Sequence, residues 1–134
     1  MQAVAESVNQ TTADKVHVLM VEDEFLISLV VADALEEQGL AVHTVDNAAD
    51  ALAYIQSGVP VDVLFTDIEL PGGVNGKALA LLVRALRPDL PIVFASGTSR
   101  ADDLREFCVR SAFLPKPYRV EQAGRIIQQM MRAA

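Results

Sequence analysis

Side chains that suit phosphate chemistry stand at the ends of four short apolar runs: the acids Glu22, Asp23, Glu24, Asp67 and Glu69, the hydroxyl of Ser96 and the ammonium group of Lys116. Several carboxylates in one small space raise one another's pKa unless a cation or a basic group offsets their charge. Carboxylate oxygens suit Mg²⁺, which binds through one or two carboxylates together with a phosphate. A hydroxyl and an ammonium group can both contact phosphoryl oxygens. Together these residue types provide what phosphoryl transfer to a carboxylate nucleophile needs, and Asp67 is the natural nucleophile.

The elements that must position these side chains begin with five short strands. The apolar runs 16–21, 61–65 and 91–95 have the length and β-branched content of buried parallel strands. Residues 41–45 alternate between apolar and polar, which favours an edge strand, and residues 112–114 fit a fifth strand.

Between the strands, apolar residues recur with helical spacing. The five stripes are Ile27, Val30, Val31, Ala34 and Leu35; Ala48, Ala51, Leu52 and Ile55; Leu79, Leu82, Val83 and Leu86; Leu104, Phe107 and Cys108; and Ala123, Ile126, Ile127, Met130 and Met131. Five strands alternating with five helices predict an α/β fold, a flavodoxin-like (βα)5 three-layer sandwich with a parallel sheet of order 2-1-3-4-5. In that order, ligands bind beyond the carboxyl ends of strands 1 and 3, where the acids stand.

Length, composition and charge limit the classes of function. The 134 residues suit one domain, and we expect a disordered N-terminal tail at 1–14 followed by a domain at 15–134 with no output domain. A formal charge of −7 opposes direct binding of nucleic acid. No apolar run approaches the roughly 18 residues that span a bilayer, and the N-terminus does not resemble a secretory signal. With a single cysteine, Cys108, the chain suits a reducing compartment, and we expect it in the cytoplasm.

The pattern resembles the receiver domains of response regulators in bacterial two-component systems. These domains carry an acidic pair after strand 1, Asp after strand 3, Ser or Thr after strand 4 and Lys-Pro after strand 5. Here the matching residues are Glu22-Asp23, Asp67, Ser96 and Lys116-Pro117. The resemblance covers about residues 15 to 132 and includes spacing as well as residue type.

This resemblance implies that Asp67 takes a phosphoryl group from a histidine kinase or a histidine phosphotransferase. It also implies that Asp23, Asp67 and the backbone carbonyl of Glu69 hold Mg²⁺, with Glu22 acting through water. From the resemblance we also expect that the protein is not an enzyme that acts on other molecules. We expect a phosphoacceptor that assists its own phosphorylation and dephosphorylation.

The resemblance also assigns a switch. Lys116 pairs with the phosphoryl group, Ser96 moves to hydrogen-bond it, and Phe113 stands at the aromatic position whose rotamer follows that movement. The peptide bond before Pro117 is cis in the family. A protein partner would then bind the face formed by the fourth helix (104–108), the fifth strand (112–114) and the fifth helix (123–131).

Three features depart from the commonest family pattern. Gly76 lies nine residues after Asp67, one more than in chemotaxis-type receivers, Glu22 replaces the commoner Asp, and Glu69 places an acid two residues after the acceptor. The string VFASGTS resembles the Phe-Ala-Thr-Gly signature of certain single-domain receivers, with Ser in place of Thr. The string PGGVNG resembles receivers served by HWE-type histidine kinases.

Other interpretations weigh less. The string PGGVNGKA resembles a phosphate-binding P-loop, but it is one residue short and Ala78 replaces the hydroxyl residue. His17 and His43 lie within strands and are expected to be packed residues rather than metal ligands. Two functional alternatives stay open, namely a receiver-fold interaction module that signals without phosphorylation and a small phosphatase that acts on external substrates.

Overall fold

The computed structural model describes residues 14–98 and 110–133 and contains a five-stranded parallel sheet of order β2-β1-β3-β4-β5. The strands are β1 (His17–Val21), β2 (Ala41–Val45), β3 (Val63–Asp67), β4 (Ile92–Ser96) and β5 (Ser111–Pro115). The order confirms the flavodoxin-like prediction, with β2 at one edge of the sheet. Strands β3 and β4 extend past the apolar runs, so that Asp67 and Ser96 are their last residues.

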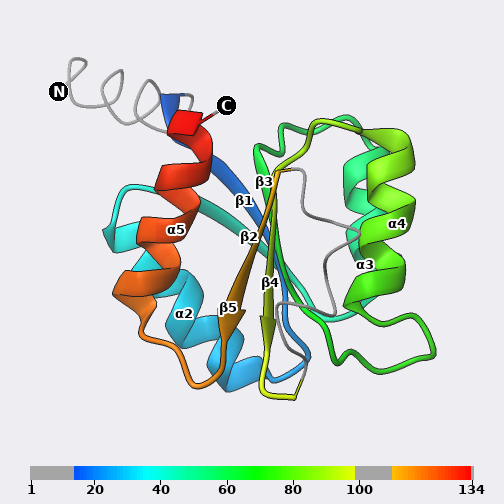
Figure 1. Ribbon diagram of the computed structural model, residues 1–134, viewed down its shortest axis with the longest axis horizontal. Helices are drawn as coiled ribbons and strands as arrows, with labels where there is room; N and C mark the ends of the chain where they lie inside the picture. Colours follow the sequence, from blue (N-terminus) through cyan, green and yellow to red (C-terminus); the bar gives the residue numbers. More distant parts are fainter. Residues whose placement is uncertain (1–13, 99–109, 134) are drawn as a thin grey trace, which may run out of the picture.

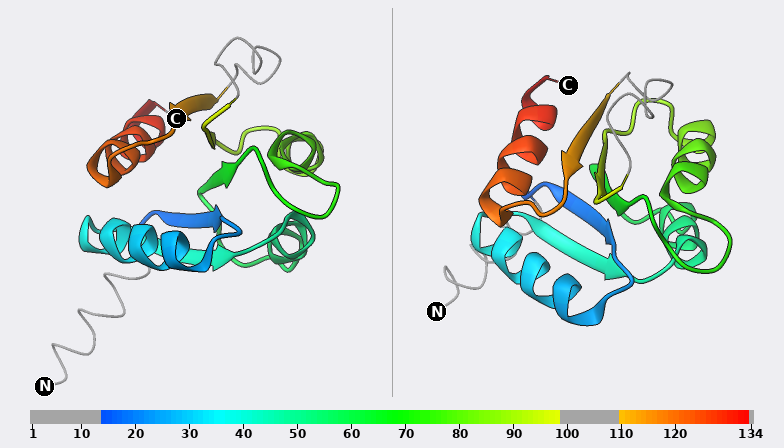
Figure 2. Two further views of the ribbon diagram at one scale, coloured as in Figure 1. Left: turned by 90° about the horizontal axis from the view of Figure 1, so that it is seen from below. Right: turned by 60° about the horizontal axis from the view of Figure 1, so that its bottom comes forward.

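Two pairs of helices cover the sheet. The helices are α2 (Phe25–Glu37), α3 (Ala48–Gln56), α4 (Gly76–Leu86) and α5 (Val120–Ala133). Helix α2 packs beside α5 on one face and α3 beside α4 on the other, which gives the three layers seen in Figures 1 and 2. The expected fourth helix around 104–108, Cys108 and tail residues 1–13 lie outside the described residues.

The core consists of two apolar clusters, one on each face of the sheet. Leu19, Leu64 and Phe94 point toward α3 and α4, whereas Met20, Phe65 and Val93 point toward α2 and α5. Strands β3 and β4 are buried along their whole length, as expected for central parallel strands covered on both faces.

Local sequence signals set the ends of several helices. The side chain of Asn47 accepts a hydrogen bond from the Asp50 N–H before α3, and that of Asn75 accepts one from the Ala78 N–H before α4. Gly39 has a positive φ just beyond the end of α2, a conformation that glycine adopts without a steric penalty.

The predicted apolar stripe of α2 is partly wrong. Val31 and Leu35 are buried, but Ile27 is 38% exposed and Val30 is 62% exposed. The buried face runs through Ser28, Val31 and Leu35 instead. Apolar residues surround the first two turns of this helix, so the 3.6-residue period cannot identify the face that packs.

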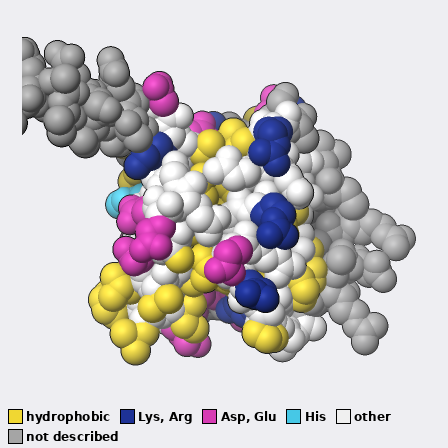
Figure 3. All heavy atoms as spheres, turned by 90° about the vertical axis from the view of Figure 1, so that its left-hand side faces the viewer, with side chains coloured by type: hydrophobic (Ala, Val, Ile, Leu, Met, Phe, Trp, Pro, Cys, Tyr) yellow, Lys and Arg dark blue, Asp and Glu magenta, His cyan; other side chains and the backbone are white. Residues whose placement is uncertain are grey.

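The exposed apolar side chains of α2 form a patch near its start, which we call the α2 patch: Phe25, Leu26, Leu29 and Val30, exposed by 75, 72, 56 and 62%. Figure 3 views this side of the molecule and shows hydrophobic side chains gathered at the end where α2 begins. Leu82 and Leu86 of α4 were also predicted to be core but are about half exposed, because α4 packs through Leu79, Ala80 and Val83.

No helix in the described part of the chain is both long and apolar enough to cross a membrane. Because all five strands are parallel, their carboxyl ends lie at the same edge of the sheet, at the bottom of the view in Figure 1. The polar residues that end β3 and β4 and those that follow β1 and β5 are therefore brought together there.

Candidate phosphoacceptor site

Three carboxylates converge where β1 and β3 end. These strands are paired, with Val21 beside Thr66, so the residues that follow them are neighbours. One carboxylate oxygen from each of Glu22, Asp23 and Asp67 lies within 4.8 Å of the other two. Glu22 and Asp67 are each only 4% exposed, whereas Asp23 faces solvent. The cluster therefore has two buried acids and one acid at its mouth.

Lys116 supplies the positive charge of the site. Its Nζ atom lies 2.6 Å from Oδ1 of Asp67 and 3.9 Å from Oε1 of Glu22. The lysine directly follows β5, and its peptide bond with Pro117 is cis, as the resemblance implies.

Burial makes the acids of the cluster weaker. The pKa of Glu22 is raised to about 7, mainly by desolvation and further by its hydrogen bond to Asp67 and the charge of that residue. Burial also raises the pKa of Asp67, although hydrogen bonds from Lys116 and Glu22 oppose the shift. The two carboxyl groups thus compete for one proton when Lys116 is their only close cation among the described residues.

The lysine responds in the opposite sense. Partial burial lowers its pKa, but the hydrogen bond to Asp67 and the negative charges of Asp67, Glu22 and Glu69 outweigh this effect, so the pKa is raised overall. The folded protein therefore favours the cationic form of Lys116 beside Asp67.

Ser96 lies at the end of β4, between the strands that carry Asp67 and Lys116. It is 1% exposed, and its hydroxyl donates a hydrogen bond of 2.7 Å to Oε2 of Glu69. The Thr98 hydroxyl donates to the same oxygen at 3.1 Å, and the Thr98 N–H donates to Ser96 Oγ at 3.1 Å. The Ser96 hydroxyl is thus bonded to the acid two residues after Asp67.

The start of α4 packs against the end of β3. The Gly76 N–H donates to the carbonyl of Ile68 at 2.7 Å, and a Cβ atom at Gly76 would overlap the backbone carbonyl of Asp67. Glycine is required here by the close approach of two backbones.

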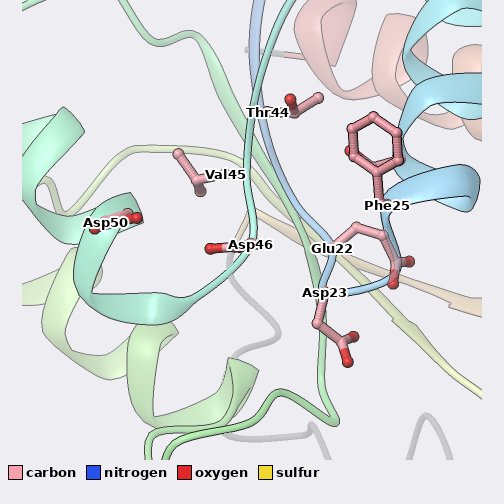
Figure 4. A pocket seen from close by; sticks show the side chains of 8 residues that line it. Glu22, Asp23, Phe25, Thr44, Val45, Asp46 and Asp50 are labelled. Carbon is pink, nitrogen blue, oxygen red and sulfur yellow. The ribbon is translucent and has the colours of Figure 1, made fainter.

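A solvent-accessible cavity of about 310 Å³ adjoins the acid cluster. Figure 4 shows Glu22 and Asp23 following β1, Phe25 at the start of α2, and Asp46 and Asp50 on the other side. The cavity brings solvent to the acids, and the α2 patch begins at its rim with Phe25.

Comparison with known proteins decides the family. Residues 18–128 match the family model described as the response regulator receiver domain. The chain belongs to the response regulator receiver family. This confirms the resemblance inferred from the four strand ends.

Similar proteins include larger regulators. The nitrogen assimilation regulatory protein NtrX of Azorhizobium caulinodans is 32% identical over 78% of this chain, and the DNA-binding transcriptional regulator NtrC of Proteus hauseri is 28% identical over 86%. The receiver spans 24% of the length of each of these two relatives.

Solved receiver structures are also similar. A response regulator receiver protein from Sinorhizobium medicae has a TM-score of 0.81 and 29% identity, covering 90% of this chain and 98% of its own. The receiver domain of NtrX from Brucella abortus has a TM-score of 0.77 and 28% identity, covering 87% and 99%.

The acid cluster of the receiver suits Mg²⁺. Its donors are carboxylate oxygens from three residues that lie close enough to share one ion, and Asp23 keeps one side accessible to water. Mg²⁺ prefers such hard oxygen donors and retains several waters. Glu22, Asp23 and Asp67 are the side chains that would hold it or its waters.

The predicted site residues do not all meet in one place. Asp23, Asp67 and Lys116 converge as predicted, whereas Phe113 lies on β5, half buried against the core beneath α3 and α4. It pairs in register with Phe94. The roles of these residues in phosphorylation and switching stay predictions.

Sequence reasoning missed two residues that lie next to the predicted site residues. Tyr118 lines a small pocket with Asp67 and packs against Phe65. Its pKa is raised by burial and by the charges of Asp67 and Glu22. Thr98 is the other, through its bond to Glu69. Thr98 lies two positions after Ser96, and Tyr118 lies two positions after Lys116. This spacing was the only feature of the sequence that could have indicated them.

Proposed function

We propose that the receiver accepts a phosphoryl group on Asp67 from a phosphohistidine of a histidine kinase or histidine phosphotransferase. The observation that carries this proposal is the 2.6 Å contact between Lys116 Nζ and Asp67 Oδ1, at a carboxylate that shares its site with Glu22 and Asp23. Lys116 Nζ lies closer to Asp67 than to Glu22, whose Oε1 is 3.9 Å away, so the cation is held directly beside Asp67.

In the transfer, a carboxylate oxygen of Asp67 attacks phosphorus, an O–P bond forms, and the P–N bond to the donor imidazole breaks. The electron pair of that bond leaves with the imidazole nitrogen, which is then protonated. Lys116 stays beside Asp67 and neutralises part of the charge of the phosphoryl oxygens. When bound by the acid cluster, Mg²⁺ would neutralise further charge on these oxygens.

The acids that surround the site favour phosphorylation of the receiver itself over turnover of other substrates. Glu22, Asp23, Asp46 and Asp50 line the adjoining cavity and no basic residue of the described chain lines it, so a free anionic substrate would be bound only weakly there. We therefore propose a phosphoacceptor, with no turnover on external substrates.

The protein that carries the phosphohistidine must cover the carboxyl end of the sheet to bring phosphorus to Asp67. The α2 patch adjoins this end, and Phe25 also lines the cavity beside Glu22 and Asp23. An exposed apolar patch of this kind is typical of a protein-binding surface. We therefore assign the α2 patch to the phosphodonor protein, with an HWE-type histidine kinase as the first candidate.

Signalling would follow from a change of surface around β5. Phe113 is only half buried at its position on β5, so it has room to change rotamer when Ser96 moves. The neighbouring face, which includes β5 and α5, would bind the downstream protein.

Phosphoramidate, a small phosphodonor, tests the assignment without a kinase. Intact-mass spectrometry should show one added phosphoryl group in the presence of Mg²⁺, none in Asp67→Asn, and a normal yield in Asp46→Asn, which removes a cavity acid outside the cluster of three. Undiminished phosphorylation of Asp67→Asn contradicts the assignment. Failure of the unsubstituted protein to react at all favours the interaction module instead.

A further inference from the structure

The side chain of Glu69 holds the hydroxyl groups of two residues that follow β4. Its Oε2 atom accepts from Ser96 Oγ at 2.7 Å and from Thr98 Oγ1 at 3.1 Å. Glu69 and Thr98 are exposed, whereas Ser96 is buried. The acid thus reaches from the segment after β3 to the segment after β4 and connects the two.

The hydroxyl of Ser96 has one hydrogen and so makes one strong donor bond at a time. In this structure that hydrogen points to Glu69, and the Thr98 N–H donates to the oxygen of the same hydroxyl at 3.1 Å. The Ser96 hydroxyl is therefore oriented both by the bond that it donates to Glu69 and by the bond that it accepts from the Thr98 N–H.

Lys116 and Ser96 differ in how they meet a phosphoryl group on Asp67. Lys116 already contacts Asp67, so phosphorylation leaves its anionic partner on the same residue. The partner of Ser96 is Glu69, a different residue, so Ser96 must break that bond before it donates to a phosphoryl oxygen. Of these two residues, Ser96 is therefore the one that must give up its hydrogen bond to a different residue.

We propose that Glu69 is a positioning residue that acts as a latch: it keeps the Ser96 hydroxyl on itself and thereby disfavours the phosphorylated state. This inference rests on the proposed phosphorylation of Asp67. The latch makes the on state harder to reach, and it allows the segment after β4 to return once the phosphoryl group is lost. Thr98 shares the same Glu69 oxygen but donates its own hydrogen, so it is not the group that is contested.

The first test uses the protein without Mg²⁺ or any phosphate analogue. Solvent-exchange NMR of the Thr98 amide should show faster exchange in Glu69→Ala, by about fivefold, because the Ser96 hydroxyl is no longer oriented to accept from this N–H. In Ser96→Ala the acceptor is absent, so adding Glu69→Ala should leave the exchange rate unchanged. If Glu69→Ala does not alter the exchange of Thr98 in the Ser96 protein, the latch is overturned.

The second test measures binding of beryllofluoride, a phosphoryl mimic, in the presence of Mg²⁺. Isothermal titration calorimetry should show about tenfold tighter binding in Glu69→Ala, since a net hydrogen bond to a charged acceptor no longer competes. Removing the acid also removes a negative charge, so the same substitution is made in Ser96→Ala. In the Ser96→Ala protein, the gain in beryllofluoride affinity from Glu69→Ala should be smaller by about threefold or more, because only the charge effect remains.

Two variants serve as controls. Glu69→Gln keeps an acceptor without the charge and should lie between the unsubstituted protein and Glu69→Ala. Thr98→Val keeps the shape of the side chain and the Ser96–Glu69 bond, and should leave the affinity within about twofold. Equal gains from Glu69→Ala with and without the Ser96 hydroxyl overturn the latch and leave charge alone as the cause.

The two tests separate failure of the latch from failure of the proposed function. A receiver that does not bind beryllofluoride at all contradicts the phosphorylation of Asp67, while the exchange of the Thr98 amide still decides whether Glu69 orients Ser96. Normal beryllofluoride binding with no coupling between Glu69 and Ser96 rejects the latch and leaves the phosphoacceptor intact.

Discussion

Lys116 and Asp67 meet across β4, and only 2.6 Å separates Nζ from Oδ1, because Asp67 ends β3 and Lys116 directly follows β5, the two strands that neighbour β4. This contact does not fully offset the burial of Asp67, because the pKa of the acid is still raised. The folded protein therefore disfavours the charged form of the Asp67 carboxyl group. Such a conflict between stability and charge is typical of functional sites.

Substitution Asp67→Asn should therefore stabilise the metal-free protein, by about 1 kcal/mol, while it abolishes phosphorylation. Asparagine keeps the size of the side chain but removes the buried charge, and Lys116 is exposed enough at 31% to be hydrated without its partner. Urea unfolding measures the change. Asp46→Asn is the control and should change neither property. A marked loss in the free energy of unfolding of Asp67→Asn would instead show that the Lys116–Asp67 ion pair stabilises the fold.

The stability of the metal-free protein should fall as pH rises from about 4.5 to about 7. Glu22 titrates near 4.5 when unfolded and at about 7 when folded, so in this window the folded state binds more protons. Its stabilising effect is complete below the lower value and is lost as pH passes the upper one. Asp67 shifts in the same direction. Unfolding free energies from urea titrations across this range should flatten in Glu22→Gln; an unchanged slope in that variant contradicts the shift.

Binding of Mg²⁺ should show the opposite pH dependence. The ion competes with the proton that Glu22 and Asp67 retain, so its affinity should increase as pH rises through about 7. Thermal unfolding with and without MgCl₂ measures this, because a ligand of the folded state raises Tm by mass action. Asp23→Asn should remove most of the increase in Tm, and Asp46→Asn should keep it. An equal loss in both variants would indicate a diffuse response to acidic surface charge.

The site was predictable because parallel strands place their carboxyl ends together. Once runs ending at Asp67 and Lys116 are recognised as strands of one sheet, convergence follows from topology alone. Side-chain detail does not follow in this way. The bond from Ser96 to Glu69 depends on rotamers and loop conformation, which no spacing in the sequence specifies.

Helix faces were predictable only where the helix is apolar on one side. Helix α5 packs through Ala123 and Ile127, as its stripe predicts. Helix α2 is apolar nearly all round, and Val30 was placed in the core although it is exposed. The additional apolar residues of α2 do not pack in the core, so core packing does not explain why they are apolar.

Gly76 should tolerate no side chain. A Cβ atom there would overlap the carbonyl of Asp67, so Gly76→Ala must displace either α4 or the acceptor strand. We expect a loss of about 1–3 kcal/mol in the free energy of unfolding, together with slower labelling by phosphoramidate. Gly97→Ala is the matched control, because among the described residues its Cβ atom would meet Lys116 Cβ alone, at 3.8 Å. Similar losses in both variants would contradict the steric explanation.

Replacement of Leu26 by serine should impair phosphotransfer from a protein donor but not from a small one. Leu26 is 72% exposed in the α2 patch, so its loss should barely affect folding. We expect its rate of phosphorylation by an autophosphorylated histidine kinase to fall by roughly tenfold, as for loss of an apolar contact in an interface. The kinase is first chosen by profiling a panel that includes HWE-type members.

The matched control for Leu26→Ser is Leu81→Ser, which removes a 57% exposed leucine from α4 on the opposite face of the sheet. Labelling of both variants by phosphoramidate should equal that of the unsubstituted receiver, since this donor needs no protein contact. A slower reaction of Leu26→Ser with phosphoramidate would show that the acceptor site itself is disturbed. If both variants react normally with the kinase, the phosphodonor does not bind the α2 patch, and the exposed apolar turn of α2 serves a different protein.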